Sequence, residues 1–179
     1  MPTRAAAKNA GLHWLFASQR EEAWAKLAFA QSYAYAGQNP AALEQAEKLA
    51  QEHPGSPAAS YGLLLAGDIL YDQGKYQEAR KDYQSVADSP NHKAALPLAL
   101  ADLALTQEAA GDCASAIATA QRFLDAYQDH YLAPPVHASL ARCLAASGQG
   151  EKAKATFERM SLLYPQTYWA DWAKTRMKG

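Results

Sequence analysis

Apolar and polar positions along the chain follow a helical period. In the stretch "SYGLLLAGDILYDQGKYQEARKDYQSVADSP", residues 60–90, apolar side chains at Leu63, Ala66 and Leu70 recur at steps of three and four. This spacing places them on one face of an α-helix, and a similar pattern resumes after Gly74. The stretch therefore predicts two amphipathic helices joined by a short turn at residues 72–75.

The helix–turn–helix pattern returns at a spacing of 37 residues. Each copy has a Gly at the turn and an Ala five residues later: Gly37 and Ala42, Gly74 and Ala79, Gly111 and Ala116, Gly148 and Ala153. Glycine suits a helix that ends in the left-handed region, and we expect the Ala where the second helix crosses the first most closely. Four residues further on, small and large side chains alternate as Ala46, Tyr83, Ala120 and Phe157, which is typical of packing positions.

Local signals mark where the second helices begin and end. Asn39 is expected to cap the second helix of the first copy, with Pro40 at its first position. Asp112 is expected to cap the second helix of the third copy in the same way. Three prolines are expected to end second helices: Pro54, Pro90 and Pro165.

These copies organise most of the chain. The predicted fold class is all-α, a right-handed helical solenoid of about four helix–turn–helix repeats with capping helices at its ends. Residues 1–19 are expected to form an N-terminal helix or extension, and residues 20–178 the solenoid. Within the solenoid we place the repeats and a final capping helix at about 20–55, 57–91, 94–129, 131–166 and 168–178.

The pattern resembles the tetratricopeptide repeat, a helix–turn–helix unit with small residues at the helix crossing. The second copy carries the family's residues most fully, at Gly67, Gly74, Tyr76, Ala79 and Tyr83. The period of 37 exceeds the family's usual 34, which implies longer junctions between repeats. The resemblance implies a concave wall lined by the first helices, where a protein or peptide partner binds.

The junction "HPGSPAAS", residues 53–60, is similar to those of bacterial cell-envelope members of the family. These are the periplasmic partner of the Tol–Pal system, the subunit that accompanies the Sec translocon, and the lipoprotein of the outer-membrane assembly machine. This narrower resemblance implies part of an envelope complex and a periplasmic or cell-envelope location in preference to a cytoplasmic one.

The family's groove positions, carried onto this sequence, give ten candidate partner-binding residues: Trp24, Gln31, Tyr35, Tyr61, Asp68, Tyr71, Asp72, Asp102, Glu108 and Arg142. Aromatic side chains with central acids suit an extended segment that carries Lys or Arg. Trp24 and Tyr61 occupy equivalent positions and have a second interpretation, as packing between hairpins. A subclass that clamps C-terminal carboxylates needs cationic and amide side chains where this chain has Leu27, Leu64, Ala101 and Ala138, so we do not expect that ligand.

Composition and charge narrow the function further. The chain has 179 residues, 49% of them hydrophobic, and a formal net charge of -1. This charge provides no basic surface for nucleic acid, which is not an expected partner. No apolar run approaches the ~18–20 residues that span a bilayer, so no transmembrane segment is expected.

Catalytic and metal motifs are not evident in the sequence. We expect no cofactor, no metal and no enzyme, although Asp68 and Asp72 share a helix face and could in principle form an acid–base pair. The histidines show no zinc-binding spacing. We expect His53, His92 and His130 to be solvated loop residues, and His137 to be a packing or groove residue.

Two further alternatives stay open at this point. Cys113 is either a small buried side chain or the partner of Cys143 in a disulfide, since antiparallel packing of adjacent helices brings the two to one level. The alternative to a partner-binding module is a homo-oligomerisation or structural assembly domain. In that case the aromatic ends of the chain, Trp14, Trp169 and Trp172, pair with another copy.

Overall fold

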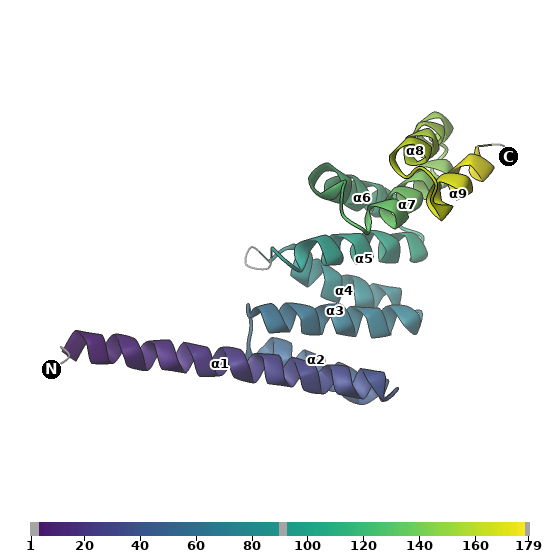
Figure 1. Cartoon of the computed structure of the whole chain (residues 1–179). Helices are drawn as coiled ribbons and strands as arrows, with labels where there is room; N and C mark the ends of the chain where they lie inside the picture. Colours follow the sequence, from purple (N-terminus) through teal and green to yellow (C-terminus); the bar gives the residue numbers. More distant parts are fainter. Residues whose placement is uncertain (1–3, 90–92, 178–179) are drawn as a thin grey trace.

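The fold is a stack of helical hairpins (Figure 1). The computed structural model describes the backbone of residues 4–89 and 93–177, and the side chains of residues 17–89 and 93–177. All regular elements in these residues are helices, which confirms the predicted all-α class: α1 (Arg4–Tyr35), α2 (Asn39–Glu52), α3 (Pro57–Asp72), α4 (Tyr76–Ala87), α5 (Leu96–Ala109), α6 (Cys113–Tyr127), α7 (Ala133–Ala146), α8 (Gly150–Leu163) and α9 (Tyr168–Arg176).

Neighbouring hairpins contact one another in chain order. Each helix packs against the next along the chain, and each odd-numbered helix also contacts the following odd-numbered helix. Figure 1 shows α2 and α4 behind α1 and α3, and the later hairpins turned relative to the first. The odd-numbered helices therefore form one wall of a solenoid, and the even-numbered helices lie behind it.

The turns within the hairpins share one backbone geometry. Gly74 has a φ of +72°, and Gly37, Gly111 and Gly148 have nearly the same value. At the second turn the N–H of Lys75 donates to the carbonyl of Leu70 at 2.9 Å, and the N–H of Gly74 donates to that of Tyr71 at 2.9 Å. This is the Schellman end of a helix, and it confirms the left-handed glycine predicted for each turn.

The caps of the second helices are only partly as predicted. The side chain of Asp112 accepts from the N–H of Ser115 at 3.1 Å, so its capping role is confirmed. The assignment of Asn39 is wrong, because α2 already begins at Asn39 and Gln38 holds the cap position without a side-chain bond. The glycine turn determines this outcome, since the next helix starts two residues after Gly37. Pro54 and Pro165 lie just beyond the ends of α2 and α8, and Pro90 lies outside the described residues.

Core packing follows the alternation of large and small side chains. Tyr83 of α4 is 2% exposed and lies against Gly67 of α3. A Cβ atom at residue 67 would lie 2.6 Å from Cε1 of the Tyr83 ring, so only glycine fits beneath this tyrosine. In the neighbouring repeats Ala46 and Ala120 take the place of Tyr83, and both are buried.

Helix α1 joins two segments that the sequence analysis separated. One continuous helix runs from residue 4 to residue 35, with no break between the N-terminal segment and the first repeat. In Figure 1 its N-terminal part extends beyond the other hairpins. The side chain of Trp14, one of the predicted aromatic ends, lies outside the described residues.

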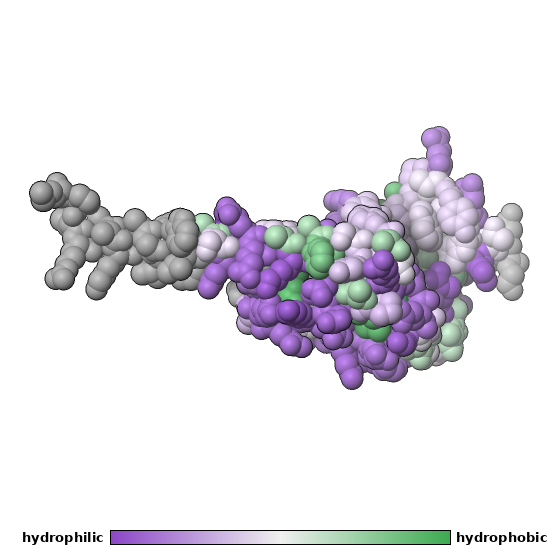
Figure 2. Space-filling view, turned by 90° about the horizontal axis from the view of Figure 1, so that it is seen from below, coloured by the Kyte–Doolittle hydropathy of each residue, from purple (hydrophilic) through white to green (hydrophobic). Residues whose placement is uncertain are grey.

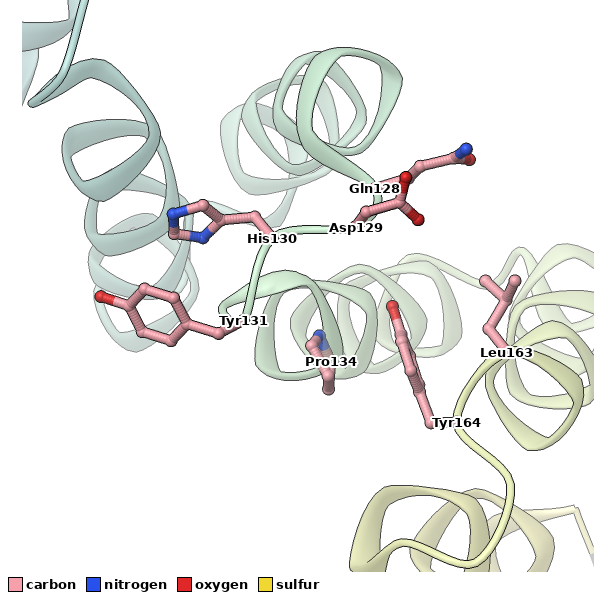
Figure 3. Close-up of a pocket in the computed structure, with 7 residues that line it drawn as sticks. All are labelled: Gln128, Asp129, His130, Tyr131, Pro134, Leu163 and Tyr164. Atoms are coloured by element: carbon pink, nitrogen blue, oxygen red, sulfur yellow. The ribbon is translucent and has the colours of Figure 1, made fainter.

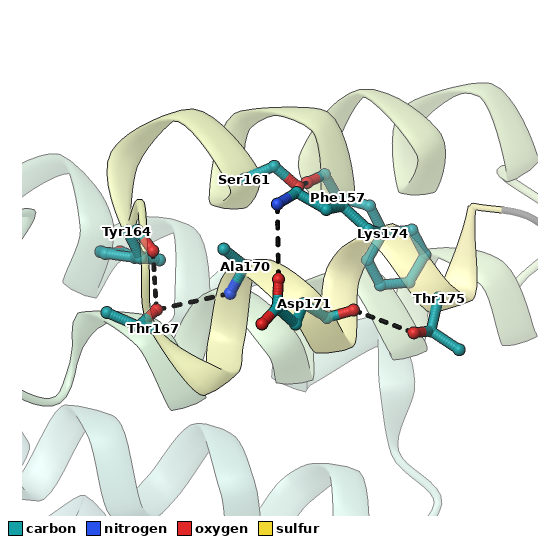
Figure 4. A network of polar contacts seen from close by, with 8 residues as sticks. All are labelled: Phe157, Ser161, Tyr164, Thr167, Ala170, Asp171, Lys174 and Thr175. Carbon is teal, nitrogen blue, oxygen red and sulfur yellow. Dashed lines mark hydrogen bonds and ion pairs between the residues drawn. The ribbon is translucent and has the colours of Figure 1, made fainter.

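The last hairpin is covered by α9. Thr167 caps this helix: its Oγ1 accepts from the N–H of Ala170 at 3.4 Å and donates to the carbonyl of Tyr164 at 2.7 Å (Figure 4). The ring of Trp172 meets that of Phe157 edge-on, with centroids 5.6 Å apart. Helix α9 therefore buries part of the apolar face that α7 and α8 would otherwise leave open.

A disulfide joins the last two hairpins. Cys113, at the start of α6, is bonded to Cys143 of α7, and their Cα atoms are 4.9 Å apart. The interpretation of Cys113 as a free buried thiol is therefore wrong. The antiparallel packing of α6 on α7 provides the close approach that a disulfide needs.

The outer surface is largely polar on the face seen from below. In Figure 2 hydrophilic residues dominate this face, and hydrophobic residues form small separate patches. Within the described part of the chain, no helix combines the length and the apolar character needed to cross a membrane.

Candidate functional site

Two adjoining pockets follow the wall of odd-numbered helices. The first, the aromatic pocket, has a volume of about 350 Å³ and is lined by Gln31, Tyr61, Leu64, Leu65, Asp68, Leu98, Asp102, Tyr131 and Leu132. The second, the acid pocket, has a volume of about 360 Å³ and is lined by Asp68, Tyr71, Asp72, Tyr83, Asp102, Leu105 and Thr106. Asp68 and Asp102 belong to both, so the two pockets form one groove.

The structure gathers most of the candidate residues at this groove. Six of the ten line one or both pockets: Gln31, Tyr61, Asp68, Tyr71, Asp72 and Asp102. Trp24 lies beside them, with its ring centroid 5.9 Å from that of Tyr61, and is 42% exposed. Trp24 thus packs between hairpins and still presents surface. Tyr35 is 91% exposed and lines neither pocket.

Glu108 and Arg142 form an ion pair with each other. Nη2 of Arg142 donates to Oε2 of Glu108 at 2.8 Å, and the guanidinium also lies over the ring of Trp172, 5.6 Å from its centroid. Neither of these two side chains lines the aromatic pocket or the acid pocket. Both charges act on Tyr71, which lines the acid pocket: burial raises the pKa of the Tyr71 hydroxyl, the charge of Glu108 adds to this effect, and that of Arg142 opposes it.

Two acids of the groove, Asp68 and Asp102, have raised pKa values. Burial raises the pKa of the half-buried Asp102 to about 7, and the charge of Asp68 adds to this. Asp68 is exposed at the groove surface, yet desolvation of its carboxyl is the largest influence and also raises its pKa. Among residues 17–89 and 93–177, no cation forms an ion pair with Asp68, Asp72 or Asp102. The carboxyl groups at the centre of the groove therefore have no cationic partner within this part of the chain.

Tyr83 connects the core to the groove. Its hydroxyl donates to Oδ1 of Asp68 at 2.7 Å, while its ring fills the space above Gly67. The bond to Tyr83 favours the ionised form of Asp68 and so lowers the pKa of Asp68 against the effect of burial. Burial, and then the charge of Asp68, strongly raises the pKa of Tyr83, which keeps the hydroxyl protonated as a donor.

Sequence reasoning missed several groove residues: Leu65, Tyr83, Leu98, Leu105, Thr106, Tyr131 and Leu132. Leu98 and Leu105 could have been found, because they lie one period after Tyr61 and Asp68. Tyr131 belongs to the irregular junction before α7, where the repeat period gives no guidance.

A third pocket, which shares Tyr131 with the aromatic pocket, lies between the junction before α7 and the end of α8. It has a volume of about 360 Å³, and Figure 3 shows the residues around it: Gln128, Asp129, His130, Tyr131, Pro134, Leu163 and Tyr164. His130 is half-buried among aromatic rings, and its Nδ1 accepts from the N–H of Leu132 at 3.2 Å. The prediction of a solvated His130 is therefore wrong.

The other histidines also depart from simple loop positions. The side chain of His53 is 12% exposed and lies 3.8 Å from Glu22, so the prediction that it is solvated is wrong. The ring therefore lies beside Glu22 of α1. His137 is buried as a packing residue, with Nδ1 2.7 Å from the Tyr164 hydroxyl, and desolvation lowers its pKa to about 4. His92 lies outside the described residues.

The positions of the carboxylate-clamp subclass are occupied differently. Leu27, Leu64, Ala101 and Ala138 are all buried apolar residues. In the described part of the chain, no group of three or more His, Cys, Asp or Glu side chains is arranged to hold a metal ion. The chemistry of the groove is therefore that of aromatic and apolar contact combined with carboxylates.

Comparison with known proteins identifies the repeat. Two models of the tetratricopeptide repeat match the chain, one at residues 27–93 and 64–129 and the other at residues 107–174. No curated protein sequence matches it. These matches support the repeat itself and give no support to the narrower likeness to cell-envelope members.

Solved structures show the same fold at low sequence identity. YrrB, a tetratricopeptide repeat protein with an unusual peptide-binding site, matches with a TM-score of 0.66 and 18% identity over 91% of this chain and 84% of its own. A tetratricopeptide repeat protein from Parabacteroides merdae matches with a TM-score of 0.74 and 16% identity, over 88% of this chain and 59% of its own. MamA matches with a TM-score of 0.68 and 16% identity, over 88% of this chain and 89% of its own. With its helical hairpins, glycine turns and matched residues 27–129 and 107–174, the chain belongs to the tetratricopeptide repeat family.

Proposed function

We propose that this chain is a non-catalytic interaction module that binds a peptide or protein segment in the groove. The observation that carries the proposal is the pair of adjoining pockets that share Asp68 and Asp102. Proteins of this repeat family generally mediate protein–protein interaction, and the structurally similar YrrB has a peptide-binding site. On the wall of odd-numbered helices, the groove offers such a segment aromatic, apolar and carboxylate contacts.

The side chains of the groove indicate the chemistry of its partner. Tyr61 and Tyr131 stand at the aromatic pocket, and Tyr131 is 73% exposed. Exposed tyrosines beside leucines provide anchor area at little cost in side-chain entropy. The unpaired carboxylates of Asp68 and Asp102 favour Lys or Arg over acidic residues. The proposed partner is therefore an extended segment with apolar and basic residues.

The test is selection of random displayed peptides on the immobilised full chain. Binding of the enriched peptides is then measured by fluorescence polarisation with the wild type and with Tyr131→Ala. We expect Tyr131→Ala to weaken binding at least about tenfold, as the loss of a buried aromatic anchor does. Tyr131 is largely exposed in the free chain, so its removal leaves the fold intact.

Tyr35→Ala is the matched control. Tyr35 is an exposed tyrosine on an odd-numbered helix that lines neither pocket, and its removal is expected to leave binding unchanged. Peptides that bind Tyr131→Ala as tightly as the wild type, or that depend on Tyr35 instead, show that the groove is not the binding surface.

The disulfide supports a place in an oxidising compartment. We propose that the chain works in the bacterial cell envelope, since disulfides persist there and are rare in reducing cytosol. The junction at residues 53–60 points the same way. Thiol alkylation of the chain from its native cells, followed by mass spectrometry, is expected to find Cys113 and Cys143 protected. Two alkylated cysteines contradict this location.

Homo-oligomerisation is the second candidate function. Tyr168 is 70% exposed beside Trp172, at a pocket of about 620 Å³ on α9. Light scattering over a range of concentrations tests it, with Tyr168→Glu as the variant, because Trp172 also packs on Phe157 and its loss disturbs the fold. A dimer abolished by Tyr168→Glu supports assembly. A monomer at all concentrations supports the binding module.

A further inference from the structure

One residue that lines the acid pocket has a hydroxyl group without a partner. Thr106 of α5 lines this pocket, is 0% exposed, and its Oγ1 forms no hydrogen bond in the structure. A threonine inside a helix commonly donates to the carbonyl four residues earlier, but Thr106 does not. Buried hydroxyls in native proteins nearly always have a partner. The hydroxyl of Ser139 is also buried without a partner, but Thr106 lines the acid pocket, where a bound group can supply one.

The polar groups around Thr106 are predominantly acceptors. Asp102 lies one helical turn earlier on the same face of α5, and Asp68 and Asp72 line the pocket from α3. None of the three has an ion-pair partner in the described part of the chain. The Tyr83 hydroxyl is already committed to Asp68 at 2.7 Å. The missing partner is therefore a cationic hydrogen-bond donor.

The form of the pocket favours an ammonium group over a guanidinium or a metal ion. Its acceptors come from two helices, α3 and α5, which suits a compact charge with three rotatable donors. A guanidinium prefers two parallel bonds to a single carboxylate. The carboxylates are not among any metal-holding group in the described residues. Leu105 and Tyr71 supply apolar wall for a methylene stem.

We propose that the acid pocket is a lysine-recognition subsite, in which the ammonium of a partner lysine donates to Asp102, Asp68 and Thr106 Oγ1. The proposal rests on the function proposed above, since the lysine belongs to the segment bound in the groove. The aromatic pocket anchors that segment, and the acid pocket selects lysine at one of its positions.

The charged surroundings make recognition depend on pH. Burial holds the pKa of Asp102 at about 7, so at pH 6 its carboxyl is largely neutral and offers the ammonium no charge. Affinity should therefore increase between pH 6 and pH 8. The other titratable or charged groups that face Asp102 and its pocket are Asp68, Tyr71 and Asp72 of α3, Tyr83 of α4, and the Glu108–Arg142 pair next to Tyr71.

The experiment uses small probes that do not depend on a known partner. Nα-acetyl-lysine methylamide is titrated into the ¹⁵N-labelled full chain, and its uncharged norleucine and its arginine counterparts are titrated in parallel. We expect the lysine probe to shift amide signals of α3 and α5, the arginine probe to bind at least about threefold more weakly, and the norleucine probe to bind negligibly. Equal binding of the norleucine or arginine probe overturns the proposal.

Two variants locate the interaction at the pocket. Thr106→Val keeps the shape of the side chain and removes a buried unpaired hydroxyl, so the fold tolerates it. It should weaken the lysine probe about fivefold or more, and Asp102→Asn should also abolish the increase between pH 6 and pH 8. Thr156→Val on α8, whose hydroxyl donates to the Lys152 carbonyl, is the control and should change nothing. Unchanged affinity in Thr106→Val overturns the subsite.

The outcomes separate this proposal from the one it rests on. If the lysine probe fails to bind while selected peptides still depend on Tyr131, the subsite is wrong and the groove stands. If the lysine probe binds and the peptides are indifferent to Tyr131→Ala, the pocket is a site for free amines and both the peptide groove and its lysine subsite are wrong.

Discussion

At the scale of single residues, the contact between Gly67 and Tyr83 carries both core packing and groove geometry. A Cβ atom on residue 67 would lie only 2.6 Å from Cε1 of the Tyr83 ring. The hydroxyl of the same tyrosine donates a hydrogen bond to Asp68. A displaced ring would therefore also move a carboxylate of the groove. Substitution of Gly67 therefore tests whether its contact with Tyr83 determines the arrangement of the groove.

Gly67→Ala is expected to destabilise the fold. Overpacking against the buried Tyr83 costs roughly 1–3 kcal/mol, and the better helix propensity of Ala returns up to about 1 kcal/mol. Urea denaturation of a double-mutant cycle with Tyr83→Ala measures the coupling. In the Tyr83→Ala background Gly67→Ala should be neutral or stabilising. An equal cost in both backgrounds would show that the ring is not the obstacle.

Asp102 makes stability depend on pH. Its folded pKa of about 7 exceeds its ordinary value of 3.8, so between these pH values the folded state binds more protons than the unfolded state. The free energy of unfolding therefore decreases as the pH rises from about 4 to about 7. Asp102→Asn removes this dependence. The variant's free energy of unfolding should exceed that of the wild type by on the order of 2 kcal/mol at pH 8, and the two should be equal near pH 4.

Urea denaturation of variant and wild type at the same pH isolates this effect. Three other groups have shifted pKa values that also make stability depend on pH: burial and the charge of Glu47 raise the pKa of Asp82 to about 6, burial raises that of Asp68, and desolvation lowers that of His137 to about 4. Asp82 and Asp68 act in the same direction as Asp102. His137 acts oppositely, since its contribution is lost as the pH falls below about 6.5. A constant difference between variant and wild type from pH 4 to pH 8 contradicts the role of Asp102.

At the scale of helices and turns, the turns within the hairpins have the same backbone conformation but differ in how the following helix is capped. Asp112 caps α6, bonding the N–H of Ser115 at 3.1 Å and Nη1 of Arg80 at 2.9 Å. At the equivalent place before α4, Lys75 makes no side-chain cap. The same turn thus exists with and without a cap within one chain, which provides an internal control.

Asp112→Ala should cost about 1 kcal/mol of stability because the first turn of α6 loses its cap. Lys75→Ala should cost nothing measurable, and Lys75→Asp should stabilise by roughly 0.5–1 kcal/mol by providing the missing acceptor. Thermal and urea unfolding of the three variants measure these values. If Arg80→Ala alone reproduces the loss of Asp112→Ala, the ion pair and not the cap is responsible.

Local patterns in the sequence were sufficient to predict the hairpins, because each turn is specified by its own glycine and each helix by its own apolar face. The length of α1 was not predicted, since the start of the first repeat was placed by register and no proline or cap separates residues 4–19 from the rest. Six groove residues followed from the family's positions. Tyr131 and Thr106 did not, because their roles depend on an irregular junction and on which groups surround a buried hydroxyl.

At the scale of the whole molecule, contacts are confined to near neighbours in the stack. Every helix–helix contact joins elements one or two places apart in the chain. Stability in such a solenoid is approximately a sum over repeats and their interfaces, so a perturbation in one hairpin affects its neighbours and leaves distant hairpins unchanged. The disulfide between α6 and α7 should therefore act locally.

Replacing both cysteines by alanine is expected to lower the free energy of unfolding by about 3.5 kcal/mol. The estimate follows from the entropy of closing a loop over a sequence separation of 30 residues. Hydrogen exchange locates the effect: protection should decrease in α5 to α8 and stay unchanged in α1 to α3. A uniform decrease over all helices contradicts a local disulfide effect. Reduction of the wild type should reproduce the pattern of the variant.

The disulfide should also influence the aromatic pocket of the groove, because that pocket includes residues of the α6–α7 junction. Cys113 and Cys143 bracket the junction that carries Tyr131 and Leu132 to the aromatic pocket. Without the covalent link, α6 and α7 are held only by packing, so Tyr131 should be less well fixed while the acids on α3 and α5 keep their places. The double alanine variant should then weaken groove-selected peptides severalfold but leave the lysine probe unaffected. If the peptides and the lysine probe lose affinity equally, the disulfide does not act on the aromatic pocket alone, which contradicts this prediction.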